Sequence, residues 1–180
     1  MRTKKWLGLL LPAALAGCSH PTAPAATNQL ASNDFENVNG WIGDMPAASL
    51  TREQAHSGVY SVSVRPGVDF SLGYNNALRL LAPEWPAKLT ISAWVLLPTE
   101  QSMPKLVTEL KPATGKGPNI FWEALDLAPA VNVYGKWRRV EKTIVLPETA
   151  TADTRLLVYL WRSESKEPAY LDDLQISRAQ

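Results

Sequence analysis

Apolar and polar residues alternate in several stretches of the chain, and this period of two predicts β-strands with one face in a core. Residues 59–64 read VYSVSV, in which Tyr60, Val62 and Val64 share one side and the serines share the other. The same alternation occurs in three further segments, which are 89–97 (LTISAWVLL), 156–162 (LLVYLWR) and 170–176 (YLDDLQI).

Shorter strand candidates lie between these segments, at 35–38, 48–52, 70–74, 106–110, 120–125 and 138–146. Windows with the helical period are few, because fourteen prolines are spread along the chain. Turn residues such as Ser57-Gly58 and Pro66-Gly67 separate the strands. About ten strands joined by turns predict an all-β fold, an antiparallel two-sheet β-sandwich.

The N-terminal residues follow a different pattern. Arg2, Lys4 and Lys5 precede a short apolar run that ends at Ala16, and this order is typical of an export signal. The run is too short for a permanent membrane helix, which needs about 20 residues. Its last residues, LAGC at 15–18, resemble the lipobox of bacterial lipoproteins.

The lipobox resemblance implies cleavage after Gly17 and acylation of Cys18, the only cysteine in the sequence. An ordinary cleaved signal, with an incidental or buried cysteine, is the alternative. Two or more acyl chains anchor a protein stably in a membrane. We therefore predict that residues 1–17 are a lipoprotein signal peptide and that the protein is lipid-anchored at the bacterial cell envelope. A serine directly after the cysteine, here Ser19, resembles the sorting signal for the outer membrane. We therefore expect the protein at the outer membrane if the bacterium is Gram-negative.

Residues 18–33 are rich in Ala, Pro, Thr, Ser and Asn and have no apolar period, which predicts a flexible linker. Residues 34–180 then form one domain. Removal of residues 1–17 would leave fifteen Lys and Arg against seventeen Asp and Glu, a net charge near −2. A slightly negative net charge does not favour binding to nucleic acid, so we predict no nucleic acid partner.

Four segments of the predicted domain stand in a characteristic order, which is NDFENVNGW at 33–41, AHSGVYSVSV at 55–64, LTISAWVLL at 89–97 and AYLDDLQI at 169–176. Their order and spacing resemble the jelly-roll carbohydrate-binding modules of bacterial glycan-degrading enzymes, in the galactose-binding-like superfamily. The resemblance covers Asp34 to Ile176. It implies a jelly-roll fold and a polysaccharide or other glycan as the ligand.

The alternation places Asp172 on the same face as Leu174 and Ile176 in the last predicted strand. A carboxylate that points toward a core must be hydrogen-bonded, paired or metal-bound, because an isolated buried charge is very costly. The family resemblance implies a structural Ca²⁺ held by Glu36, Asp172 and carbonyls near Gly58. The alternative is that Asp172 caps backbone amides or pairs with an arginine.

Aromatic residues predict the binding surface, because sugar sites combine flat apolar groups with a few polar ones. Alternation turns Trp94, Tyr159 and Trp161 outward, and in 120–125 either Trp122, or Phe121 with Glu123, faces outward. If these strands share one sheet, the rings form an exposed patch flanked by carboxylates. The alternative is that the tryptophans pack inside, where tryptophan is mostly found. The predicted ligand-binding residues are Trp94, Trp122, Tyr159, Trp161, Glu109 and Glu123.

Few residues suit catalysis. His56 lies beside Ser57 in a predicted turn, but no third partner follows from the sequence. Glu123 and Asp126 are three residues apart, so on a strand they face opposite sides and do not form the carboxylate pair of a glycosidase. We therefore predict a protein without enzymatic activity that binds a glycan. The alternative is a lipoprotein subunit of an envelope complex, which binds a protein partner through the same aromatic residues.

Overall fold

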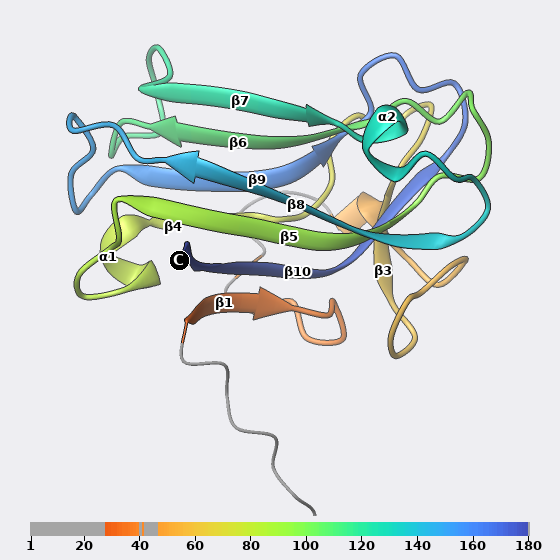
Figure 1. Ribbon diagram of the computed structural model, residues 1–180, viewed down its shortest axis with the longest axis horizontal. Coiled ribbons are helices and arrows are strands. Elements are labelled where there is room, and N and C mark those ends of the chain that lie inside the picture. Colours follow the sequence, from red (N-terminus) through yellow and green to blue (C-terminus); the bar gives the residue numbers. More distant parts are fainter. Residues whose placement is uncertain (1–27, 40, 42–46, 180) are drawn as a thin grey trace, which may run out of the picture.

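The computed structural model of the chain describes residues 28–39, 41 and 47–179 (Figure 1). The predicted signal peptide, Cys18 and most of the predicted linker lie outside the described residues. In the described part, ten strands form two antiparallel sheets packed face to face. This arrangement confirms the predicted all-β jelly-roll sandwich. None of the described helices has the length and hydropathy of a membrane span.

The larger sheet has six strands in the order β2-β3-β10-β5-β8, with β1 also paired to β10. Its strands are β1 (Gln29–Asn33), β2 (Leu50–Thr51), β3 (Ser61–Val64), β5 (Lys88–Leu96), β8 (Trp137–Val145) and β10 (Ala169–Arg178). The smaller sheet has the order β4-β9-β6-β7, and its strands are β4 (Tyr74–Ala77), β6 (Lys105–Lys111), β7 (Phe121–Asp126) and β9 (Arg155–Trp161). The short helices are η1 (Ala47–Ser49), α1 (Leu78–Leu81) and α2 (Leu127–Val131).

The core lies between the sheets and takes alternate residues from each strand. On β9, Leu156, Val158 and Leu160 are fully buried, whereas the residues between them are half-buried. Burial of one such aliphatic side chain contributes about 1.5–3 kcal/mol. The period of two therefore decides which face of each strand points inward and which remains free for a ligand.

The domain begins earlier than predicted. Residues Gln29–Asn33 form β1, which pairs antiparallel with β10 and ends with Asn33 opposite Leu174. These residues are therefore part of the sandwich and not of the predicted linker at 18–33. The strand is polar except for Leu30 and Ala31, which pack against the core, so its apolar pattern was too weak to recognise. Pairing with β10 supplies the partners for its backbone.

Residues 35–38, predicted as a strand, form a bend instead. Phe35 is buried in the core, with 1% of its surface exposed. Its φ angle is 60°, and its amide donates a hydrogen bond to Asn33 Oδ1 at 2.7 Å. This left-handed backbone is uncommon for a residue other than glycine and cannot continue a strand.

A bulge in β10 changes the side to which Asp172 points. Between Asp172 and Gln175, β10 has one residue more than the paired stretch of β5, and Asp173 has a φ angle of 48°. Asp172 pairs with Trp94 on the outer face, whereas Leu174 lies in the core. The prediction that Asp172 shares the face of Leu174 is therefore wrong, because the extra residue shifts the alternation.

Candidate functional site

Most of the predicted binding residues lie on β6, β7 and β9, which belong to the smaller sheet of the sandwich (Figure 1). On β9, Tyr159 and Trp161 lie on the side opposite the buried aliphatic residues. The register places Glu109 of β6 opposite Leu157 of β9 and opposite Trp122 of β7. Directly opposed residues share a face of a sheet. Three adjacent strands therefore bring Trp122, Glu109, Tyr159 and Trp161 onto one face.

Glu109 is a buried charge on this face, with 6% of its surface exposed. The Tyr159 hydroxyl donates a hydrogen bond to its Oε1 at 2.6 Å, and Lys111 Nζ lies 3.1 Å from its Oε2. The ammonium compensates the charge, but no hydrogen bond of good geometry reaches the buried Oε2 within the described residues. Oε2 is therefore a buried acceptor that, among the described residues, is compensated by the ion pair with Lys111 alone.

Tyr159 is fixed as the donor of this contact. Burial, and then the hydrogen bond to Glu109, raise the pKa of Tyr159 well above its ordinary value. The hydroxyl consequently stays protonated under all conditions in which the protein would normally work. The Tyr159 ring and the Glu109 carboxylate are thus held together as one unit.

Exposed aromatic rings border this unit. Phe70 forms an isolated bridge with Trp161, and the two rings stack with centroids 6.4 Å apart and an angle of 17° between their planes. Phe70 also meets Tyr159 edge-on at 5.7 Å. Phe70 and Trp122 are each 48% exposed, so flat apolar surfaces face solvent on both sides of Glu109.

A groove of about 360 Å³ opens on this face. Its lining includes Trp41, Phe70, Asn75, Glu109, Leu157 and Tyr159. Gly73 also lines it, and a Cβ atom at this position would lie 2.0 Å from the carbonyl oxygen of Val158. Only glycine therefore lets the chain before β4 approach β9 closely enough to form this wall of the groove.

Trp94 lies outside this groove. The strand β5 belongs to the larger sheet, and Trp94 stacks on the His56 ring with centroids 3.9 Å apart on the outer side of that sheet. The condition that the predicted strands share one sheet holds for β6, β7 and β9 and fails for β5. Trp94 and Tyr159 therefore face opposite sides of the sandwich.

Glu123 is also separate from the groove. It lies opposite Thr108, a fully buried residue, and so on the side of β7 that faces the larger sheet. Its carboxylate pairs with Lys142 of β8 at 3.0 Å. Burial lowers the pKa of Lys142, and Glu123 partly offsets this effect. This ion pair connects the edges of the two sheets, which resolves the ambiguity at 120–125 with Trp122 outward.

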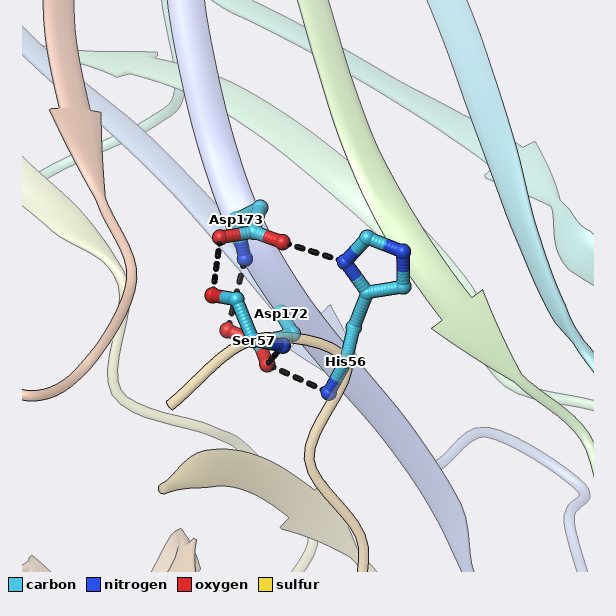
Figure 2. A network of polar contacts seen from close by, with 4 residues as sticks. All are labelled: His56, Ser57, Asp172 and Asp173. Atoms are coloured by element: carbon cyan, nitrogen blue, oxygen red, sulfur yellow. Dashed lines mark hydrogen bonds and ion pairs between the residues drawn. The ribbon is translucent and has the colours of Figure 1, made fainter. Parts of the chain in front are cut away.

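A polar cluster of His56, Ser57, Asp172 and Asp173 occupies the outer face of the larger sheet (Figure 2). His56 Nδ1 lies 2.5 Å from Asp173 Oδ2, and the Ser57 hydroxyl donates a hydrogen bond to Asp173 Oδ1 at 2.7 Å. The serine hydroxyl thus contacts the aspartate and not the histidine. Activation of a serine nucleophile needs an adjacent base that takes its proton, so the cluster fixes the turn on the sheet instead.

Asp172 is completely buried beneath this turn. It accepts hydrogen bonds from the amides of His56 at 2.8 Å, Ser57 at 3.1 Å and Asp173 at 2.7 Å. Burial raises the pKa of Asp172, and these backbone hydrogen bonds partly offset the shift. Of the alternatives that the sequence left open, amide capping is the one that the structure contains.

The second carboxylate of the predicted calcium site also accepts amide hydrogens. Glu36 Oε1 takes the amides of Val59 at 2.7 Å and Tyr60 at 2.6 Å, and it lies against Gly58, whose φ angle is 57°. The described residues include no group of three or more His, Cys, Asp or Glu that could hold a metal. This donor set does not fit the six to eight oxygens that Ca²⁺ takes. These contacts do not support the calcium site predicted from the sequence, and only a binding or melting measurement tests it.

No family model and no curated protein matches the sequence. Solved structures do match. One contains the CBM22-1 and GH10 modules of Clostridium thermocellum xylanase 10B with xylohexaose, with a TM-score of 0.56 at 16% identity over 85% of this chain and 29% of that chain. Another is the CBM22-2 xylan-binding domain of Paenibacillus barcinonensis Xyn10C, with a TM-score of 0.52 at 19% identity over 83% of this chain and 99% of that chain.

A third match is a xylan-binding domain from CBM22, with a TM-score of 0.54 at 17% identity over 86% of this chain and 97% of that chain. The chain spans only 51% of the tandem CBM22-1–CBM22-2 structure from Paenibacillus barcinonensis. At these identities the likeness shows the fold, which is the jelly-roll β-sandwich of carbohydrate-binding modules.

Sequence reasoning missed Phe70, Asn75, Lys111 and Leu157 as groove residues. Phe70 reaches the site through its bridge to Trp161, a contact between distant segments that alternation does not reveal. Lys111 could have been predicted from the sequence, because it follows Glu109 by two positions and therefore lies on the same face of the strand.

Proposed function

We propose that the protein is a non-catalytic module that binds a xylan-type polysaccharide in the groove on the outer face of the smaller sheet. Two kinds of support agree. The groove combines exposed aromatic rings with a small number of oriented polar groups, as sugar sites require. The solved structures with this fold include several xylan-binding modules.

The observation that carries the proposal is the environment of the Oε2 atom of Glu109. This atom is buried in the groove lining, where Lys111 Nζ lies 3.1 Å away but no hydrogen bond of good geometry is made within the described residues. A sugar hydroxyl that donates to this carboxylate would form a charge-assisted hydrogen bond, which is stronger than a neutral one. Tyr159 and Lys111 already hold the carboxylate in place, so little ordering is needed when the ligand arrives.

The aromatic rings supply the second part of the recognition. Tyr159 of β9 and the neighbouring Phe70 present ring surfaces on one side of Glu109, and Trp122 of β7 presents one on the other side. The apolar face of a pyranose ring can lie against each of them, and the equatorial hydroxyls then point to the polar groups. Rings on several strands suit a chain of sugars better than a single one.

Affinity electrophoresis in gels that contain xylan, a β-glucan or no polysaccharide tests the proposal. We expect xylan to retard the wild-type protein, and Tyr159→Ala and Trp161→Ala to reduce this retardation with unchanged circular dichroism. If no polysaccharide retards the protein, and purification from envelopes recovers one stoichiometric protein partner instead, the glycan proposal fails and a subunit of an envelope complex is the better account.

We also propose that an acylated Cys18 anchors the module in the membrane of the bacterial envelope. The support is the sequence pattern that ends in LAGC at 15–18. Mass spectrometry of the membrane-extracted protein should find diacylglycerol and an N-acyl chain on Cys18. Cys18→Ala should lose the lipid and move the protein to the soluble fraction, whereas a variant that stays in the membrane would contradict the anchor.

A further inference from the structure

Two basic side chains stand together on the face that carries the groove, one in its lining and one beside it. Lys111 of β6 and Arg155 of β9 are directly opposite each other in the register, on the same outer face as Glu109 and Tyr159. Lys111 lines the groove itself. Like charges in directly opposed positions destabilise a pair of strands. The pair therefore needs a compensating anion.

The described residues compensate only one of these two cations. Lys111 Nζ lies 3.1 Å from Glu109 Oε2. Arg155 has no carboxylate partner anywhere in residues 28–39, 41 and 47–179. The acidic residue nearest to it in sequence, Asp153, pairs with Arg79 at 2.8 Å. One positive charge, that of Arg155, is thus left over beside the groove.

Arg155 is nevertheless held in one orientation by a neutral residue. Its Nε and Nη2 donate hydrogen bonds to Asn75 Oδ1 at 3.1 and 2.7 Å, and Nη2 also donates to the Asn75 carbonyl at 2.9 Å. Asn75 lines the groove. No hydrogen bond from Nη1 to another described residue is found. A guanidinium that an amide orients keeps its full charge and retains free N–H groups for a ligand.

We propose that Arg155, oriented by Asn75 and assisted by Lys111, is a subsite for a carboxylate on the bound glycan. The groove then prefers a polysaccharide that carries uronic acid residues over a neutral one. This inference rests on the proposed function and names the ligand class within it. A guanidinium matches a carboxylate in both charge and geometry, whereas a neutral chain would leave the charge of Arg155 without a partner.

Glucuronoxylan tests this inference, in comparison with the same polymer after its carboxyl groups have been reduced to primary alcohols. Reduction removes the charge and keeps the chain. We expect the wild-type protein to bind native glucuronoxylan roughly tenfold more tightly than the reduced polymer, in line with one charge-assisted contact. The preference should weaken as the salt concentration rises, because the contact lies at an open surface.

Arg155→Gln is the informative variant, and Arg79→Gln is its control, because Arg79 already pairs with Asp153 at an exposed position. Arg155→Gln should bind both polymers equally, and Arg79→Gln should keep the wild-type preference. Equal binding of the two polymers by the wild-type protein overturns the carboxylate subsite and leaves the proposed function standing. Binding of neither polymer overturns both. The wild-type comparison decides the matter even if Arg155→Gln does not fold.

Discussion

At the scale of single residues, Glu109 combines three properties that rarely occur together on a surface strand. It is buried, it is charged, and one of its oxygens accepts no hydrogen bond of good geometry among the described residues, although Lys111 Nζ lies 3.1 Å from it. Burial of a carboxylate is costly unless it is paired, and Tyr159 and Lys111 supply only part of what it can accept. A ligand hydroxyl would complete the set.

Replacement of this carboxylate measures its part in binding. Glu109→Gln keeps the shape of the side chain but removes the charge, so its contact with a sugar hydroxyl becomes an ordinary neutral hydrogen bond. We expect xylohexaose affinity to fall roughly tenfold, which corresponds to about 1.4 kcal/mol. Isothermal titration calorimetry measures the affinity of both proteins for xylohexaose. Glu141→Gln on β8, where the side chain is 48% exposed, is the matched control and should bind as the wild type does.

Single residues on the outer face of the smaller sheet were partly predictable from the sequence. Alternation with buried aliphatic neighbours identified Tyr159 and Trp161 as outward, because a strand has only two sides. The same rule turned Trp94 outward correctly but could not place it, since it carries no information on which sheet a strand joins. Glu123 needed the register of β7 against β6, which only the three-dimensional structure provides.

At the scale of elements, the last strand and the turn above it form a unit that depends on Asp172. Its carboxylate holds the amides of His56, Ser57 and Asp173. Asp172→Ala would leave these donors without a protein partner, at a cost of roughly 1–3 kcal/mol for each one that stays away from water. We expect a clear loss of stability in urea unfolding. Asp153→Ala, an exposed ion-pair partner, should cost less than about 1 kcal/mol.

The first strand gives a second prediction at this scale. A chain that starts at Asp34, the boundary expected from the sequence, lacks β1 and the contacts of Leu30 and Ala31 with the core. A loss of about 2 kcal/mol would lower its melting temperature by roughly 4–8 °C relative to a chain that starts at Asn28. Equal melting temperatures would show that β1 adds nothing to the stability of the sandwich.

Elements were predictable where their apolar pattern was strong. The segments at 89–97 and 156–162 became β5 and β9 with nearly the expected bounds. β1 was missed because it is mostly polar and owes its structure to pairing with β10. The bulge in β10 was missed because an extra residue leaves no mark in a short alternating segment, yet it decides where Asp172 points.

Calcium binding would change the stability of the whole molecule, because an ion that binds only the native state must stabilise it. The amide donors around Asp172 and Glu36 already occupy these carboxylates. We therefore expect the melting temperature to be the same in EDTA and in millimolar CaCl₂. A higher melting temperature in CaCl₂ than in EDTA would show that calcium is bound. At a calcium concentration a hundred times the Kd, binding would stabilise the native state by about 2.7 kcal/mol.

At the scale of the whole molecule, the two outer faces of the sandwich differ in character. The smaller sheet presents the groove with Glu109, whereas the larger sheet presents the turn around His56 that Asp172 and Asp173 hold in place (Figure 2). Of the predicted binding tryptophans, Trp122 and Trp161 lie on the first face and Trp94 lies on the second. This gives a matched pair of variants that separates the faces.

The most direct test of a glycan groove on the smaller sheet is the affinity of Trp122→Ala and Trp94→Ala for xylohexaose, measured by calorimetry on proteins whose folding has been verified by circular dichroism. We predict that Trp122→Ala binds at least several-fold more weakly than the wild type and that Trp94→Ala binds with unchanged affinity. Loss of binding in Trp94→Ala alone, or in both variants equally, would contradict a binding face on the smaller sheet.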